Sequence, residues 1–470
     1  MEEFLSIFLN KKSKKPIYQQ LGEALYGLID DGVLQKDSKL PPIRKMASAL
    51  RVNSVTVVNA YKYLENRKAV YCVVGSGTYV SPFGSIKTSK NIINNALTED
   101  ADKNFSINDA INLSANSTPV SLFPHEDFKI LFNKILDRDK GNAFICRDFS
   151  GYKPLRETIC CLLANYGIKA DAEQTRIVSG VGQGSGIIAK TLLNPGDVVL
   201  VENPANYGAL GAFYERGCQI IDVHMQHDGM DLEQLENLLK LHHPKLIYIT
   251  PYYQTPLGAV YSLQKKRSIL QLAEKYNCHI LEEDSCADFN YAQEKVIPLK
   301  ALDYKNKVIY MKNFTNVLTP AVKLSCIVMP AKTEHTQHEK YVSDMPIGLM
   351  QRALHLHIES GRFKEHVERM RQIYKLRCET AIRYADEHLG DYISYEKPGG
   401  GLGLWLEFNQ NIDTVQLCSM LAAKKVVVAP GNMFSLHNRF ANCLRLSFAM
   451  ADESQIEQGI KIISQTVKKC

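Results

Sequence analysis

Four consecutive residues, Gly180, Val181, Gly182 and Gln183, stand between the strand-like segment RIVSG and the helical segment GIIAKTLL. A turn of this kind leaves backbone N–H groups free at the start of a helix, where the helix dipole also favours negative charge. The turn can therefore receive a phosphate or a carboxylate. The same glycines can instead serve only a tight strand-to-helix connection that binds no ligand, and the sequence leaves both interpretations open.

The segments around this turn alternate between strand-like runs and helical stripes. The apolar runs DVVLVENP, QIIDV, KLIYITP, HILEED and KVIYMKNF are interrupted by helical patterns such as SLQKKRSILQLAEKY. This alternation predicts an α/β domain with a doubly wound, mostly parallel sheet. We expect the domain to cover residues 108–470, and the mixed pattern after about residue 385 predicts a smaller C-terminal α+β subdomain.

Length and composition exclude several classes of protein. The chain has 470 residues and 45% of them are apolar, as in ordinary globular proteins, so disorder is excluded as its main state. It has no run of 18 apolar residues and no secretory signal pattern, and we expect a soluble cytoplasmic protein with no membrane partner. The twelve cysteines are scattered, with no CxxC pair. We therefore expect reduced thiols and no metal site.

Positive charge is concentrated at the N-terminus. Residues 1–90 contain 14 Lys and Arg against 7 Asp and Glu, a net charge of +7, while the whole chain carries only +6. The remainder is thus slightly negative. This asymmetry indicates an anionic partner for the N-terminal part, and nucleic acid is the first candidate.

The N-terminal part also has the pattern of a helix-turn-helix. A helical stripe over residues 16–34 ends at Gly32, and KLPPIRKMASAL places Pro41 and Pro42 at the start of a second helix. A turn and a third helix through about Arg67 follow, and this third helix is of the kind that lies in a major groove. The segment YCVVGSGTYVSP predicts two strands around a glycine turn, which would form a wing.

Residues 16–81 resemble the winged helix of the GntR regulators. The shared patterns are P-x-Y-x-Q-L, L-P-x-x-R-x-x-A, T-V-x-x-A-Y-x-x-L and G-S-G-T-Y-V. The resemblance implies a DNA-binding domain over residues 1–81 that contacts double-stranded DNA. An Arg is frequent in the family at the position of Ser54, so one DNA contact is missing here. The implied DNA contacts are Arg44, Asn53, Ser54, Val55, Thr56 and Gly75.

The rest of the chain resembles a second family. Residues 82–107 are polar and predict a flexible linker. The segments DFSGYKPLRETICCLLANYGI, LLNPGDVVLVENPANYG, TPYYQTPLG, VVVAPGNMF and LRLSFA are similar to those of fold-type-I aminotransferases, which use pyridoxal phosphate. A GntR winged helix joined to this fold defines the MocR subfamily of transcriptional regulators. The resemblance implies a dimer held together by the large domain.

The lysine to which the family attaches its cofactor is absent. In the family's lysine segment the register is fixed without a gap by Tyr310, Phe314 and Pro320, and the lysine position then holds Asn316. An amide cannot replace the amine in covalent catalysis. Lys312 is up to ~13 Å away along an extended segment, and is a poor substitute.

Other positions of the implied pocket are also altered. Glu283 replaces the Asp that meets the pyridine nitrogen, Ser285 and Asn206 replace two tyrosines, and Lys323 replaces an Arg that binds the phosphate. Asp284 should point away from Glu283, because one step along a strand reverses the face. The anion-binding scaffold survives in Gly180, Val181, Gly182 and Gln183, with Thr315 and Lys323 as further donors. Arg445 occupies the position that grips the substrate carboxylate, although a structural ion pair is also open.

The sequence therefore predicts a DNA-binding transcriptional regulator rather than an enzyme. Its aminotransferase-like domain should be inactive, form a homodimer and sense a small anionic or amino-acid-like metabolite, with no covalent cofactor. Three alternatives remain: a regulator that binds pyridoxal phosphate non-covalently, a regulator that responds through a protein partner without a small ligand, and an active aminotransferase.

Overall fold

A computed structural model describes most of the chain in two compact units, residues 1–94 and 95–470. The described residues are 16–30, 34, 38–50, 52–66, 69–73, 77–80, 110–146, 148–206, 210–292, 296–320, 322–330, 346–436 and 439–469. The expected linker, residues 82–107, lies outside them. In the described part of the chain, no helix is long and apolar enough to cross a membrane.

The first unit is a winged helix. Its three helices are α2 (Ile17–Asp30), α3 (Ile43–Leu50) and α4 (Ser54–Asn66), and its wing consists of the antiparallel strands β1 (Val70–Val73) and β2 (Gly77–Val80). Each helix is amphipathic and buries its apolar face in a shared core. The core includes Leu21, Leu25, Met46, Val57, Ala60 and Leu64. The expected helix-turn-helix and wing are both present.

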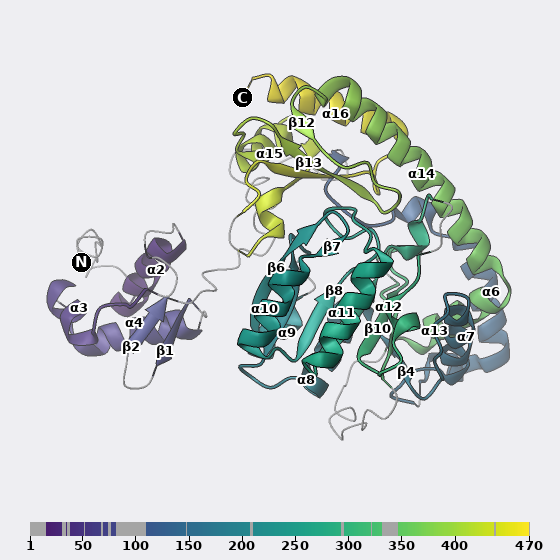
Figure 1. The fold of residues 1–470 in the computed structure, drawn as a ribbon, viewed down its shortest axis with the longest axis horizontal. Coiled ribbons are helices and arrows are strands. Elements are labelled where there is room, and N and C mark those ends of the chain that lie inside the picture. Colours follow the sequence, from purple (N-terminus) through teal and green to yellow (C-terminus); the bar gives the residue numbers. More distant parts are fainter. Residues whose placement is uncertain are drawn as a thin grey trace. The chain divides into compact units, whose positions relative to one another are not determined.

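The second unit is built on an eight-stranded mixed sheet (Figure 1). Its strand order is β4-β11-β10-β9-β8-β5-β6-β7. Neighbouring strands are parallel from β10 to β6, whereas β11 and β7 run opposite to their neighbours. The bounds are β4 Thr175–Val178, β5 Val198–Asn203, β6 Gln219–Gln226, β7 Gly229–Met230, β8 Leu246–Ile249, β9 His279–Asp284, β10 Val308–Asn313 and β11 Ser325–Val328.

Helices cover both faces of this sheet. One face packs against α8 (Gly180–Leu192) and α9 (Gly211–Glu215). The other packs against α10 (Leu232–His242) and α11 (Leu263–Lys275), and further along against α7 (Lys153–Ala164) and α13 (Gly348–Glu359). Successive strand residues alternate between the two cores, as the pleat requires: Val199 and Val201 face α8, while Val198 and Leu200 face α10. The expected doubly wound α/β fold is confirmed.

The C-terminal subdomain is a four-stranded antiparallel sheet covered by helices. Its order is β12-β13-β16-β15, and its core includes residues of α14 and α16. The first half of α14 packs in the core of the large sheet and its second half packs here, so this helix joins the two subdomains (Figure 1). The bounds are β12 Ile393–Ser394, β13 Gly403–Phe408, β15 Ala429–Pro430, β16 Cys443–Ser447, α14 Arg362–Leu389, α15 Thr414–Ala422 and α16 Glu453–Val467.

One short strand joins this subdomain from the beginning of the second unit. Strand β3 (Ile111–Asn112) pairs in parallel with β14 (Val426–Val427), although more than 300 residues separate them in the sequence. The segment that follows β3 continues toward the large sheet and reaches the turn η2 (Val120–Leu122) and then α6 (His125–Asp139). The sequence patterns did not predict this pairing.

Candidate functional site

Glu283 lies near the end of β9, on the sheet face that α8 covers. Its register partner in β10 is Met311, which packs against α8 at Gly184. The Glu283 carboxylate accepts hydrogen bonds from the hydroxyl groups of Tyr248 and Ser285. Burial raises the pKa of the Glu283 carboxyl, and these two donors oppose that rise. Both carboxylate oxygens are thus engaged by the protein.

Asn316 is held beside the same serine. Its side-chain amide donates to the backbone carbonyl of Ser285 at 3.1 Å, and its own backbone carbonyl accepts from the Thr118 hydroxyl. Asn313 connects the group further, because its amide donates to Ser285 Oγ at 3.2 Å and its carbonyl oxygen accepts from the backbone of Thr315 at 3.0 Å. The structure therefore brings Glu283, Ser285, Thr315 and Asn316 into one network.

The glycine turn forms the N-terminus of α8, as the sequence predicted. Gly180 has a φ of 78°, which a side chain would strain, and both Gly180 and Gly182 border open space. The side chain of Gln183 folds back and accepts from the backbone N–H of Ser179 at 2.6 Å. The N–H of Ser179, the residue before α8, is therefore already satisfied by the side-chain oxygen of Gln183.

Arg445 lies in β16 and is 91% buried, with 9% of its surface exposed. Its guanidinium stacks over Phe434 at 4.9 Å and donates through Nη2 to the backbone carbonyl of Ser114. Its Nε has no hydrogen-bond partner, and no carboxylate pairs with it, in the part of the chain that the structure describes. Burial lowers the pKa of Arg445 to about 10. The side chain is a buried cation with spare donor capacity.

The segment after β3 connects Arg445 to Asn316. Ser114 accepts from Arg445, Asn116 donates to Thr255 at 3.3 Å, and Thr118 donates to the backbone of Asn316. Residues 114–118, which we call the bridging segment, therefore run from Arg445 to Asn316. No motif in the sequence indicated this role for them.

Two predicted residues lie at the margin of this network. Asn206 is exposed, and its neighbour Ala205 donates from its backbone N–H to the carbonyl of Phe434 at 3.1 Å, which connects this loop to the Arg445 region. Lys323 is exposed with a φ of 43°. Within the described ranges, Lys323 makes no hydrogen bond or ion pair with the other predicted pocket residues.

Lys312 and Asp284 lie on the opposite face of the sheet. Lys312 is 1% exposed and pairs with Asp284 at 3.0 Å and Asp288 at 2.7 Å. Tyr310 and Tyr166 donate to the same two carboxylates, at 2.5 and 3.0 Å. Burial alone would lower the pKa of Lys312, but the two aspartates raise it well above its usual value. The contacts agree with the prediction that Asp284 points away from Glu283.

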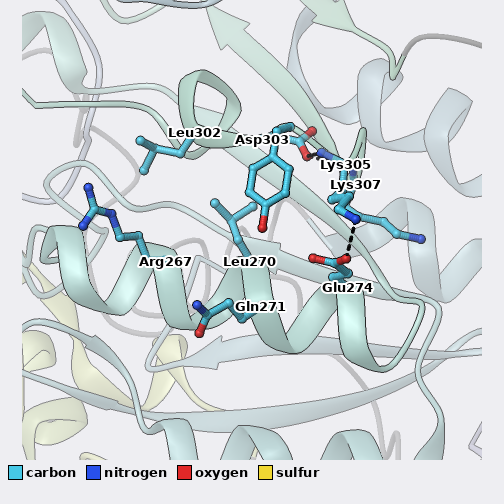
Figure 2. A pocket seen from close by; sticks show the side chains of 9 residues that line it. Arg267, Leu270, Gln271, Glu274, Leu302, Asp303, Lys305 and Lys307 are labelled. Carbon is cyan, nitrogen blue, oxygen red and sulfur yellow. Dashed lines mark hydrogen bonds and ion pairs between the residues drawn. The ribbon is translucent and has the colours of Figure 1, made fainter.

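A surface hollow of about 200 Å³ lies elsewhere, between α11 and the loop before β10 (Figure 2). The hollow lies at the amino-terminal end of β10. Glu283 and Asn316 lie instead near the carboxyl-terminal ends of β9 and β10. At the edge of the hollow, Lys305 Nζ and Glu274 Oε1 form an ion pair at 2.9 Å (Figure 2). None of the predicted pocket residues lines it. The lining residues are Arg267, Leu270, Gln271, Glu274, Leu302, Asp303, Tyr304, Lys305 and Lys307.

The predicted DNA contacts cluster at the starts of α3 and α4. Arg44 is exposed in the first turn of α3, and Ser54 and Val55 are exposed in the first turn of α4. Asn53 precedes α4, and its side-chain oxygen accepts from the backbone N–H of Val55 at 3.0 Å, as a helix cap. Thr56 is half-buried. Gly75 lies outside the described residues.

Sequence reasoning missed several residues of the network. They include Ser114, Thr118, Tyr248, Asn313 and Phe434, and each contacts a predicted site residue. Tyr248 lies in the apolar run KLIYITP, which predicted a strand but did not indicate a partner for the phenol. No metal-binding group of His, Cys, Asp or Glu side chains occurs in the described residues, and the eleven cysteines found there are free.

Comparison with known proteins matches this two-unit organisation. Residues 17–80 match the family model of the bacterial regulatory proteins of the gntR family, and residues 108–315 match that of class I and II aminotransferases. A protein of Rhizobium meliloti described as "probable rhizopine catabolism regulatory protein MocR" is 26% identical over 475 residues, which cover 97% of this chain and 94% of that protein. The chain thus has the domain combination of a MocR-like regulator, a GntR-family winged helix followed by an aminotransferase class I and II domain. The HTH-type transcriptional regulator YdcR of Escherichia coli (strain K12) is also 26% identical to it, over 96% of this chain and 99% of that protein.

The large unit of this MocR-like regulator has the fold of an aminotransferase. A kynurenine aminotransferase from Pyrococcus horikoshii superimposes with a TM-score of 0.73 and 27% identity, over 81% of this chain and 94% of that one. That enzyme is described as a complex with PMP, kynurenine and the product KYA.

Proposed function

We propose that this MocR-like regulator binds operator DNA as a homodimer, and that its aminotransferase-like domain senses a small carboxylate instead of catalysing a reaction. The proposal rests on Asn316, which the resemblance to fold-type-I aminotransferases aligns with the cofactor lysine and which the structure holds against Ser285. An amide has no nucleophilic amine and does not gain or lose a proton near neutral pH, so it can neither attach an aldehyde nor act as a general acid or base.

The remaining residues around Asn316 do not fit a covalently bound cofactor. Asn316 is tied to Ser285, and both oxygens of Glu283 are taken by Tyr248 and Ser285. Lys312, the nearest lysine in the sequence, is neutralised by two buried aspartates on the other face of the sheet. These contacts support the proposal that no lysine amine near Asn316 is available to react with an aldehyde.

Arg445 supports the binding of a carboxylate effector. A buried guanidinium without an acidic partner in the described residues is costly, and a ligand carboxylate that accepts a bidentate pair of hydrogen bonds would repay that cost. Its neighbour Phe434 leaves one face of the guanidinium apolar. A second anionic group of the ligand could be received at the Gly180–Gly182 turn, where the backbone borders open space.

An exposed apolar patch supports the homodimer. Phe144, Ile145, Phe149 and Ile347 are 57%, 46%, 51% and 69% exposed. Ile145 lies beside Gly348, the residue after Ile347, because a side chain at Gly348 would meet the backbone of Ile145 at 3.0 Å. Apolar side chains gathered in this way are usually covered by another protein surface, and we assign this surface to a second copy of the chain.

Pyridoxal phosphate is the probe that tests the central proposal. Purified full-length protein should be colourless, should stay colourless after incubation with pyridoxal phosphate, and should give no stoichiometric adduct on a pocket peptide after borohydride reduction and peptide mapping. The matched variant is Asn316→Lys, which restores the amine but not Glu283, Ser285 or Asn206. It should form an adduct weakly and slowly.

Two outcomes would change the interpretation. A stoichiometric adduct mapped to Lys312 or Lys323 of the wild-type protein would contradict the proposal that no lysine of this domain binds pyridoxal phosphate covalently. Absorbance that appears on adding pyridoxal phosphate and disappears on dialysis, without any reduced adduct, would support a regulator that binds this molecule non-covalently. The open backbone at Gly180 and Gly182 is the observation that favours this second candidate.

A further inference from the structure

The valine at the start of α4 is exposed in a position where it can have no role in the protein core. Val55 is 61% exposed, the largest exposed fraction among the large apolar side chains of the described winged helix. The buried side of α4 is formed by Val57, Ala60 and Leu64. Since successive residues turn by about 100° in a helix, Val55 points roughly opposite to them.

The outer side of α4 forms a stripe that begins with Val55. Asn59 and Lys62 are exposed at four and seven residues further along, which is the spacing of one helical face. From the N-terminal end of α4 onward, this face presents an apolar side chain (Val55), an amide (Asn59) and a cation (Lys62). A recognition helix presents its N-terminal residues to base edges in the major groove and contacts the backbone further along.

The cap of α4 leaves Val55 free to make an outward contact. The backbone N–H of Val55 is satisfied by the side chain of Asn53 at 3.0 Å, and the residue before Val55 is an exposed serine. A valine has one strongly preferred rotamer in a helix, so its two methyl groups are already fixed before any partner arrives. An apolar side chain at this place has one matching feature in the major groove, the C5-methyl group of thymine.

We propose that Val55 contacts a thymine methyl group in each half-site of the operator, and that this contact determines part of the sequence preference. The proposal rests on the DNA binding proposed above. A contact worth about one buried methylene corresponds to a change of about four-fold in affinity per half-site.

Deoxyuridine substitution tests the contact, because deoxyuridine differs from thymidine only by the missing methyl group. The full-length protein first selects its site from a random duplex library, and each thymine of the selected duplex is then replaced in turn. At one thymine per half-site, the wild type should lose about four-fold in affinity. Val55→Ala should bind the two duplexes equally, because its side chain no longer reaches the methyl group.

Lys62→Ala is the matched control on the same helical face. It should weaken binding to every duplex and reduce the salt dependence, while the four-fold preference for thymine at that position remains. The proposal is overturned if no thymine in the selected site is sensitive to the loss of its methyl group, or if the sensitivity persists undiminished in Val55→Ala. Failure to enrich any duplex would overturn DNA binding itself, and the Val55 contact with it.

Discussion

His357 makes the stability of the large unit sensitive to acid. It lies in α13 with no exposed surface, between Phe128 and Phe363 at ring distances of 5.2 and 6.1 Å. Neither ring nitrogen has a hydrogen-bond partner among the described residues. Burial lowers the pKa of His357 to about 4. The neutral ring is therefore favoured in the folded protein, and the unfolded chain binds the proton more readily.

The sign and size of the effect follow from this difference. The contribution of His357 is fully present above its unfolded pKa of about 6.5 and is lost as the pH falls toward 4. Between pH 7.5 and pH 5, the free energy of unfolding should fall by about 2 kcal/mol because of this histidine alone. His357→Phe, which keeps an aromatic ring among aromatic neighbours, should remove that part of the pH dependence.

The single tryptophan, Trp405, provides the assay. It lies in β13 of the large unit, so urea unfolding followed by its fluorescence reports on this unit and not on the winged helix. His125→Phe is the control, because the side chain of His125 is 76% exposed. The control should keep the wild-type pH dependence. An equal loss of stability between pH 7.5 and pH 5 in the wild type and in His357→Phe would refute the reasoning.

Four other substitutions have defined outcomes. Lys312→Met should lower the free energy of unfolding by about 3–5 kcal/mol in urea titrations, because it leaves two buried aspartates unpaired; an unchanged midpoint would contradict the ion-pair assignment. Arg445→Ala should cost about 2–5 kcal/mol of affinity for a carboxylate ligand retained from the cell, and identical calorimetric titrations would reject its role. Ile347→Glu should give monomers by light scattering while Leu241→Glu, equally exposed on α10, should not; two dimers would move the interface elsewhere. Arg44→Ala should weaken operator binding by about 1–3 kcal/mol in fluorescence anisotropy, and unchanged affinity would remove Arg44 from the interface.

The sequence was sufficient where structure depends on local patterns. The winged helix and the alternation of strands and helices both follow from periodicity and from short motifs. Strand alternation also predicted that Glu283 and Asp284 face opposite sides, and their contacts with Tyr248 and Lys312 agree. Each of these predictions needed only residues that are close together in the chain.

Contacts between distant segments could not be predicted in this way. Lys312 was rejected as a substitute because of its reach, whereas the structure adds a stronger reason, the second aspartate at position 288. The contact between Ser114 and Arg445 joins residues 331 positions apart. A backbone carbonyl as partner leaves no trace in residue types, since every residue has one. The pairing of β3 with β14 is hidden for the same reason.

The bridging segment has a consequence for how a signal would leave the pocket. Ser114 accepts from the guanidinium of Arg445 and lies two positions after Asn112, the last residue of β3. A carboxylate that takes the donors of Arg445 competes directly with this carbonyl. Ligand binding at Arg445 would therefore release Ser114, which follows closely after the short strand β3 that pairs with β14. Since coupling free energies are reciprocal, whatever displaces the bridging segment would change ligand affinity by the same factor.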